Sequence, residues 1–169
     1  MAAPPVPVAS APTLVISPPR AAAGFDSQRI IYLRDAYKLE YFANSEWVDP
    51  PPRMLGPLLA SALERSGAFR AVIQAPGSAS GDLRLDTQVI RLQQEFQTRP
   101  SRARFTLRAY LVDDKSRRVV AWREFEAEVP AASDDPYGGV VAANQAVQMV
   151  LADLSAFCAE AARGLTLGK

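Results

Sequence analysis

Apolar and polar residues alternate most clearly in the middle of the chain. Three segments, 83–92, 103–111 and 119–129, place an apolar side chain at every second position. The first segment changes phase at Val89-Ile90, which predicts a β-bulge there. Because each segment has one apolar and one polar face, the pattern predicts an antiparallel sheet that is covered on one side only.

Shorter apolar runs predict further strands in the first half of the chain. Thr13–Ile16 is stopped by a Ser-Pro-Pro turn, and a brief run over 69–73 follows later. The β-branched and aromatic runs at 29–33 and 37–42 are separated by three residues, which is typical of a hairpin.

Two helices are predicted from the 3.6-residue periodicity. The first begins at Asp49-Pro50, has apolar residues at helical spacing over 54–63 and ends at Gly67. The second runs from about 139 to 163, and its expected inner stripe consists of Val140, Val141, Val147, Leu151, Leu154 and Cys158. The elements together predict an α+β two-layer sandwich, an antiparallel sheet with both helices packed on one face.

Proline and alanine dominate the first twelve residues. Residues 1–12 contain four prolines and no charged side chain, which predicts an extended tether. We therefore expect a tether over 1–12, a single α+β domain over 13–164 and a short tail over 165–169. No apolar stretch approaches the roughly 18 to 20 residues that are needed to span a bilayer.

The composition excludes several kinds of chemistry. The 169 residues include no histidine and one cysteine, Cys158, so zinc sites of imidazole and thiolate and Ser-His-Asp or Cys-His nucleophile systems cannot be built. We assign no catalytic, cofactor-binding or metal-binding residue. Cys158 lies in an apolar run, where packing is the favoured interpretation; a dimer disulfide or a lipid attachment is the alternative.

The net charge of +1 gives no general argument for a nucleic-acid partner. A basic strip, Arg99, Arg102, Arg104 and Arg108, with Tyr110 for stacking, could still form a local groove. If residues 114–118 make the turn, Arg104 faces Glu128, Arg108 faces Glu124, and Tyr110 faces Trp122. This register predicts cross-strand ion pairs and an aromatic pair, and no nucleic-acid site. Arg123 falls on the apolar face, where a strand end, a second bulge or a buried pair would explain it.

Several other polar residues allow two interpretations each. Asp49, Asp134 and Asp135 could supply acid-base groups or hard-metal ligands, but 134–138 is more typical of a turn before a helix. Gly138-Gly139 is weak evidence for an anion site. Trp47 either packs on the first helix or contacts a ligand. Asn144 and Gln148 interrupt the inner stripe of the second helix, so they either bond to backbone in the core or contact a partner or lipid.

The order of these segments resembles a known family. The residues that carry the likeness are Phe25-Asp26-Ser27, Ile30-Ile31-Tyr32, the strand over 37–42, Trp47-Val48-Asp49-Pro50-Pro51, the strand over 83–96, and Ala142-Ala143-Asn144-Gln145-Ala146. The set is similar to the ABC-type transport auxiliary lipoproteins of the paraquat-inducible protein C type. The likeness spans about 13–160, although no single motif is specific.

The resemblance implies a non-enzymatic periplasmic lipoprotein anchored to the outer membrane. Such proteins accompany MCE-type ABC machines that move lipids or other hydrophobic molecules between the two membranes, and the resemblance also suggests a homo-oligomer. The family's lipid-bearing cysteine follows a signal peptide. Residues 1–12 contain no cysteine, so we expect that anchor upstream of Ala2.

Three alternatives stay open. Asn144 and Gln148 would suit a lipid-binding carrier domain with a pocket between the sheet and the helices. A structural adaptor of a secretion or pilus assembly would share a small sandwich of this kind. An enzyme that uses Asp49, Asp134 or Asp135 is the least favoured of the three.

Overall fold

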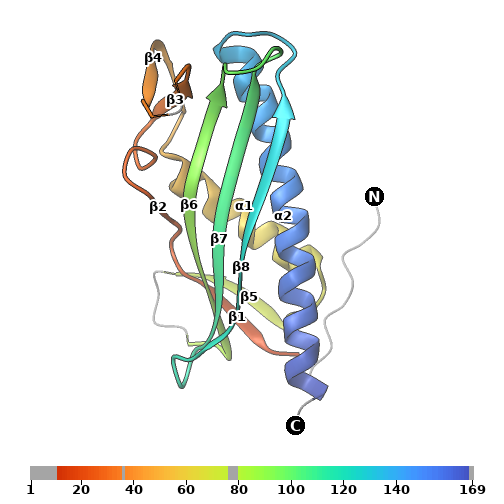
Figure 1. Ribbon diagram of the computed structural model, residues 1–169. Coiled ribbons are helices and arrows are strands. Elements are labelled where there is room, and N and C mark those ends of the chain that lie inside the picture. The colour runs from red at the N-terminus through yellow and green to blue at the C-terminus, as the bar shows by residue number, and fades with distance from the viewer. Residues whose placement is uncertain (1–10, 36, 76–79, 168–169) are drawn as a thin grey trace.

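A computed structural model describes residues 11–35, 37–75 and 80–167 of the chain (Figure 1). The tether predicted over 1–12 therefore lies, for its first ten residues, outside the described residues. The elements in chain order are β1 (Thr13–Ile16), β2 (Arg20–Ala21), β3 (Arg29–Leu33), β4 (Glu40–Glu46), α1 (Pro51–Arg65), β5 (Ala71–Gln74), β6 (Leu83–Glu95), β7 (Arg102–Asp113), β8 (Val119–Pro130) and α2 (Pro136–Leu167).

The three long strands β6, β7 and β8 form the antiparallel meander that the alternation predicts. The register shifts between Val89 and Arg91, so the predicted bulge is confirmed. The predicted β7–β8 register is confirmed from Arg102 to Leu111, with Tyr110 opposite Trp122, but it shifts by one residue next to the turn, where Val112 faces Val119. A short turn fixes the register of a hairpin, which is why this pairing can be derived from the chain alone.

The rest of the sheet is mixed, and the prediction of a purely antiparallel sheet is wrong. Strands β1, β2 and β3 all pair in parallel with β6, and β5 pairs in parallel with β1. Only β4 joins this half antiparallel, through its hairpin with β3. The connection from β1 to β5 contains α1, and a crossover of this kind is what parallel neighbours require. Alternation reports a strand's faces, but it does not report its neighbours.

Both helices pack against the sheet and against each other. Helix α1 begins with Pro51 and Pro52 in its first turn, and Gly67 follows its end with φ +69°, as predicted. Its inner residues, including Leu59, join one core cluster with β1, β6 and α2. Helix α2 lies along β7 and β8, where Leu154 is 1% exposed. The predicted packing of two helices on a sheet is therefore confirmed.

The buried stripe of α2 differs from the predicted one. Leu151, Leu154 and Cys158 are buried as expected, but Val141 is 38% exposed. The buried positions in the first half of the helix are mostly alanines, namely Ala142, Ala143 and Ala146. Small side chains let the helix approach the sheet closely, and Val150 also faces the core, whereas Val141 turns to solvent.

By length and composition alone, Pro136–Leu165 within α2 is long and apolar enough to cross a bilayer, with a hydropathy of 1.3. This corrects the expectation that no segment reaches that threshold. The helix packs on β7 and β8 in the fold, and the core helix of a folded domain meets the same criterion.

Candidate functional site

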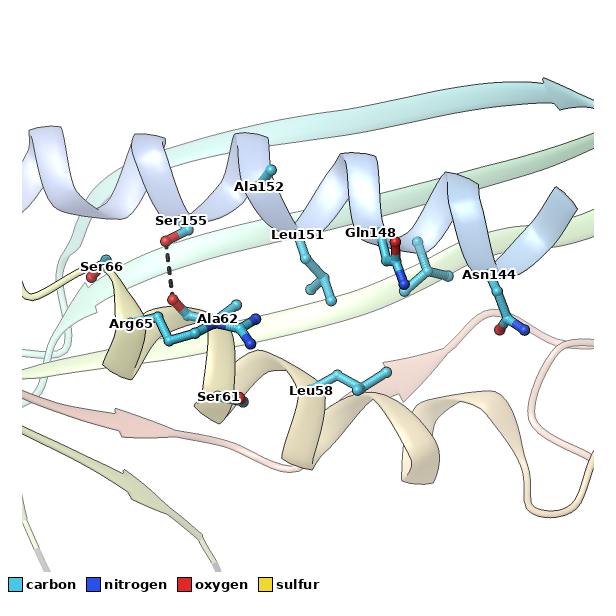
Figure 2. Close-up of a pocket in the computed structure, with 11 residues that line it drawn as sticks. Leu58, Ser61, Ala62, Arg65, Ser66, Asn144, Gln148, Leu151, Ala152 and Ser155 are labelled. Atoms are coloured by element: carbon cyan, nitrogen blue, oxygen red, sulfur yellow. Dashed lines mark hydrogen bonds between the residues drawn. The ribbon is translucent and has the colours of Figure 1, made fainter. Parts of the chain in front are cut away.

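A groove with a volume of about 800 Å³ lies between α1 and α2 (Figure 2). Helix α1 lines one wall and helix α2 the other. The lining residues are Leu58, Ser61, Ala62, Arg65, Ser66, Asn144, Val147, Gln148, Leu151, Ala152 and Ser155. The spacing of the α2 residues, at intervals of three and four, is that of one helix face.

Asn144 and Gln148 lie on this wall of α2, one turn apart, and both are exposed. The prediction of buried amides in the core is therefore wrong, because the stripe they interrupt turns toward α1 and solvent. Within the described ranges neither amide has a protein hydrogen-bond partner. Their donors and acceptors are free for a bound molecule.

The groove has an apolar middle and polar ends. Leu58 is 47% exposed on the α1 wall, and Leu151 lies across from it on α2. At one end the Ser155 hydroxyl donates to the Ala62 carbonyl oxygen at 3.3 Å, which joins the two helices (Figure 2). Arg65 lies at that same end. This arrangement suits an elongated molecule with an apolar body and a polar group.

Trp47 is not part of the groove. It is partly buried and packs against the core, next to a cavity of about 10 Å³ that Ile31, Gly139 and Ala143 also line. Its backbone N–H donates to the Gln28 carbonyl at 2.8 Å. The structure thus separates Trp47 from the two amides, and the residues that share its small cavity come from β3, β6 and α2 rather than from the first helix, on which it was expected to pack.

The candidate carboxylates at the start of α2 are held by local hydrogen bonds. Asp135 accepts from the Gly138 N–H at 2.8 Å and from the Ser133 hydroxyl at 2.7 Å. Asp134 accepts from the Ser101 N–H at 2.8 Å. These donors, led in each case by the backbone N–H, hold the pKa of both carboxyls below the ordinary value. The interpretation as a turn and helix cap is confirmed.

The third candidate carboxylate lies elsewhere. Asp49 precedes α1, and its Oδ1 lies 3.8 Å from Nη1 of Arg53 in the first turn of that helix. No group of three or more His, Cys, Asp or Glu side chains in the part of the chain that the structure describes could hold a metal ion. The three aspartates therefore do not meet in one acid-base or metal site.

The glycine pair at the start of α2 has a packing role. A Cβ on Gly138 would collide with the Ser133 backbone, and one on Gly139 would collide with the side-chain amide of Gln94. Because Asp135 already takes the Gly138 N–H, this helix terminus offers less to an anion than the sequence suggests.

The basic strip on the open face of the sheet is neutralised across the strands. Arg104 contacts Glu95, Glu126 and Glu128, and Arg108 contacts Glu124 at 2.9 Å. The predicted ion pairs are confirmed, and the strip does not form a free basic groove.

Trp122 and Arg123 of β8 each contact an aromatic ring. The Trp122 and Tyr110 rings stack with centroids 6.0 Å apart. Arg123 does lie on the helix side of β8. None of the three predicted explanations holds, because its guanidinium lies over the Phe157 ring at 4.8 Å and its side chain reaches solvent at the sheet edge.

A protein-family model described as "ABC-type transport auxiliary lipoprotein component" matches residues 1–155. No curated protein matches the chain. A crystal structure of a Xanthomonas campestris protein is similar with a TM-score of 0.84 and 25% identity, over 96% of this chain and 94% of that one.

More distant solved structures share the fold. A Chlamydia trachomatis protein has a TM-score of 0.57 at 7% identity, over 86% of this chain and 96% of its own. The PelC dodecamer from Paraburkholderia phytofirmans has a TM-score of 0.54 at 13% identity, over 89% of this chain and 92% of its own.

Proposed function

Because the chain belongs to the ABC-type transport auxiliary lipoprotein component family, we propose that it is a non-enzymatic accessory lipoprotein of an MCE-type transport system. In this role it lies in the periplasm, an N-terminal lipid anchor holds it to the outer membrane, and it docks the machine there. The transported molecules are lipids or other hydrophobic compounds. The observation that carries the proposal is the family match over residues 1–155.

The way the carboxylates are used supports a role without catalysis. The carboxylates of Asp134 and Asp135 accept hydrogen bonds from backbone N–H and hydroxyl groups. Their pKa values are therefore lowered rather than raised toward neutral pH. A general acid at neutral pH needs the opposite shift.

We also propose that the protein works as a homo-oligomer. The PelC protein from Paraburkholderia phytofirmans, which shares this fold, is a dodecamer. Solution mass measured by light scattering at several protein concentrations tests this part. A mass of one chain at every concentration would contradict it.

A genetic experiment tests the transport role. Strains lacking this gene, lacking the permease gene of the transport system, or lacking both should show the same sensitivity to membrane-perturbing compounds. Equal sensitivity of all three strains is expected because the products act in one pathway. An additive defect in the double mutant would overturn the proposal.

A second candidate function is binding of a hydrophobic molecule in the groove between α1 and α2. Its volume of about 800 Å³, the exposed Leu58 and the free amides of Asn144 and Gln148 favour it. Volumes of this size accommodate ligands of a few hundred daltons.

Native mass spectrometry after mild extraction would reveal a retained lipid. We expect Leu58→Glu to lose it, whereas Val141→Glu, at an exposed position of α2 outside the groove, keeps it. A ligand-free mass for the unmodified chain, or equal retention by both variants, would rule out this candidate.

A further inference from the structure

The tether joins the domain at one end of the sheet, which we call an edge below. At this end β1, β5, β6 and β8 begin and β7 finishes. Thr13 pairs with Ala71 of β5, and Leu14 pairs with Leu83 of β6. Leu83 in turn faces Asp113 at the end of β7, next to the turn that leads into β8. This edge is the lower end of the sheet in Figure 1, opposite the β3–β4 hairpin and the start of α2. Pro12, the residue before β1, therefore lies among these strand ends.

Four exposed cations flank the point where the tether leaves. We call Arg70, Lys115, Arg117 and Arg118 the basic edge. The Arg70 N–H donates to the Pro12 carbonyl at 3.0 Å, and the other three form the turn between β7 and β8.

The carboxylate that lies beside these cations is Asp82. Its pKa is lowered first by the hydrogen bond from the Thr13 N–H and further by the charges of Lys115 and Arg70. Both cations are therefore close to the start of β1.

The other two carboxylates at this edge, Asp113 and Asp114, also accept hydrogen bonds from groups within the fold. Asp113 accepts from the N–H groups of Lys115 and Ser116, each at 2.9 Å. Asp114 is buried and accepts from Arg84 at 2.8 Å and from Arg117 at 3.1 Å.

Three side chains of the basic edge are therefore not paired with a carboxylate of the described fold, and their charges are available to an outside partner. Arg70, Lys115 and Arg118 form no ion pair within the described ranges, and all three are exposed. They stand in contrast to the arginines of the open sheet face, which glutamates neutralise. An exposed cationic edge of this kind suits a surface that carries many phosphates.

We propose that the basic edge binds the anionic phospholipid headgroups of the membrane to which the protein is tethered. The inference rests on the proposed function only for the existence of that anchor. Cations next to a lipid anchor add electrostatic attraction to anionic lipids to the membrane binding that the anchor provides. The same contact orients the domain, so that the β3–β4 hairpin and the start of α2 point away from the membrane.

Vesicle flotation of the unlipidated chain tests the headgroup contact apart from the anchor. We expect binding to phosphatidylcholine vesicles that contain phosphatidylglycerol, little binding to pure phosphatidylcholine, and weakening with added sodium chloride. Each cation near the surface contributes about fivefold in affinity. The double variant Lys115→Gln with Arg118→Gln should therefore bind about 25-fold more weakly.

The matched control removes two cations from the opposite end of the molecule. Lys38→Gln with Arg99→Gln makes the same change in net charge and should bind as the unmodified chain does. None of the four substituted residues has an ion pair in the described part of the chain, and Asp82 is held mainly by Thr13 rather than by the charge of Lys115, so both doubles should unfold at nearly the same urea concentration as the parent.

Three results would overturn the proposal: equal loss in both double variants, equal binding to neutral and anionic vesicles, or displacement by inorganic phosphate well beyond that by chloride at matched ionic strength. The last result would indicate a discrete phosphate site in place of a membrane surface. The transport role is tested separately, since vesicle binding can hold when the genetic experiment fails, and the reverse is also true.

Discussion

Arg84 and Asp114 form the most buried ion pair among the described residues, with Nε and Oδ1 2.8 Å apart and the Asp114 side chain 2% exposed. Arg84 also donates to the Ser17 hydroxyl at 3.2 Å, and Asp114 accepts from the Gly81 N–H at 3.0 Å. The pair therefore ties the end of β1, the start of β6 and the β7–β8 turn into one joint.

Removing the carboxylate from this joint should destabilise the domain. Asp114→Ala leaves the Arg84 guanidinium and the Gly81 N–H without their acceptor, which should cost about 2 kcal/mol of unfolding free energy. Urea denaturation followed by circular dichroism measures the change. Asp153→Ala, at an exposed position of α2 without a partner in the described residues, is the control and should change stability little. Similar losses in both variants would contradict the role of the joint.

Acid should unfold the protein through its aspartates. Asp114 has a pKa below the ordinary value, owing first to the hydrogen bond from Arg84, and Asp82 has a lowered pKa owing first to the Thr13 N–H. A depressed folded-state pKa stabilises the fold fully above the unfolded-state value, about 3.9, and this contribution is lost as pH falls through the folded-state pKa.

The chain has no histidine, so no imidazole titrates near neutral pH. We expect urea midpoints to be nearly constant between about pH 6 and 8 and to decrease steeply below about pH 4. A midpoint that decreases between pH 8 and 6 would contradict this assignment.

Two glycines of α2 should respond to alanine in opposite directions. At Gly139 the new Cβ meets the buried amide of Gln94, so Gly139→Ala should destabilise the protein by about 1–3 kcal/mol. At Gly164 a Cβ has no neighbour within 4 Å, so Gly164→Ala should stabilise by up to about 1 kcal/mol through helix propensity. Thermal unfolding of the two variants checks the signs, and a stabilised Gly139→Ala would show that α2 does not approach Gln94 this closely.

The single thiol should be unreactive in the folded protein. Cys158 is 0% exposed, and burial raises its pKa to about 12. Thiol reagents attack the thiolate, which is nearly absent at pH 8. We expect no labelling by a chromogenic disulfide reagent at pH 8 without denaturant and one equivalent in urea. Rapid labelling of the folded chain would place Cys158 outside the core and reopen the dimer-disulfide and lipid-attachment interpretations.

Local patterns predicted the antiparallel half of the fold because short connections limit the choices there. The turn between β7 and β8 allows few registers, and opposite charges at Arg108 and Glu124 select one. The parallel half could not be predicted in this way, because β1 and β6 meet through Leu14 and Leu83. No local signal links residues that far apart in the chain.

The groove between α1 and α2 could not be predicted from hydrophobic periodicity, which does not show how two helices pack against each other. Asn144 and Gln148 were expected either to bond to backbone in the core or to contact a partner or lipid, and the structure places both exposed on the α2 wall of the groove. Helix α2 in fact packs on both the sheet and α1, so a second face is partly covered. Leu58, which belongs to the apolar positions at helical spacing over 54–63, is 47% exposed and lines the groove.

If the protein is the envelope-anchored auxiliary component of an ABC transport system, it should contact the other components in the cell. The most direct test is crosslinking of the native, tagged protein in living cells, followed by purification from detergent-extracted membranes and identification of the attached proteins by mass spectrometry. We expect the protein in the outer-membrane fraction, crosslinked to an MCE-type protein of the transport system. A protein recovered from the cytoplasm, or one crosslinked only to components of a secretion or pilus assembly, would contradict it.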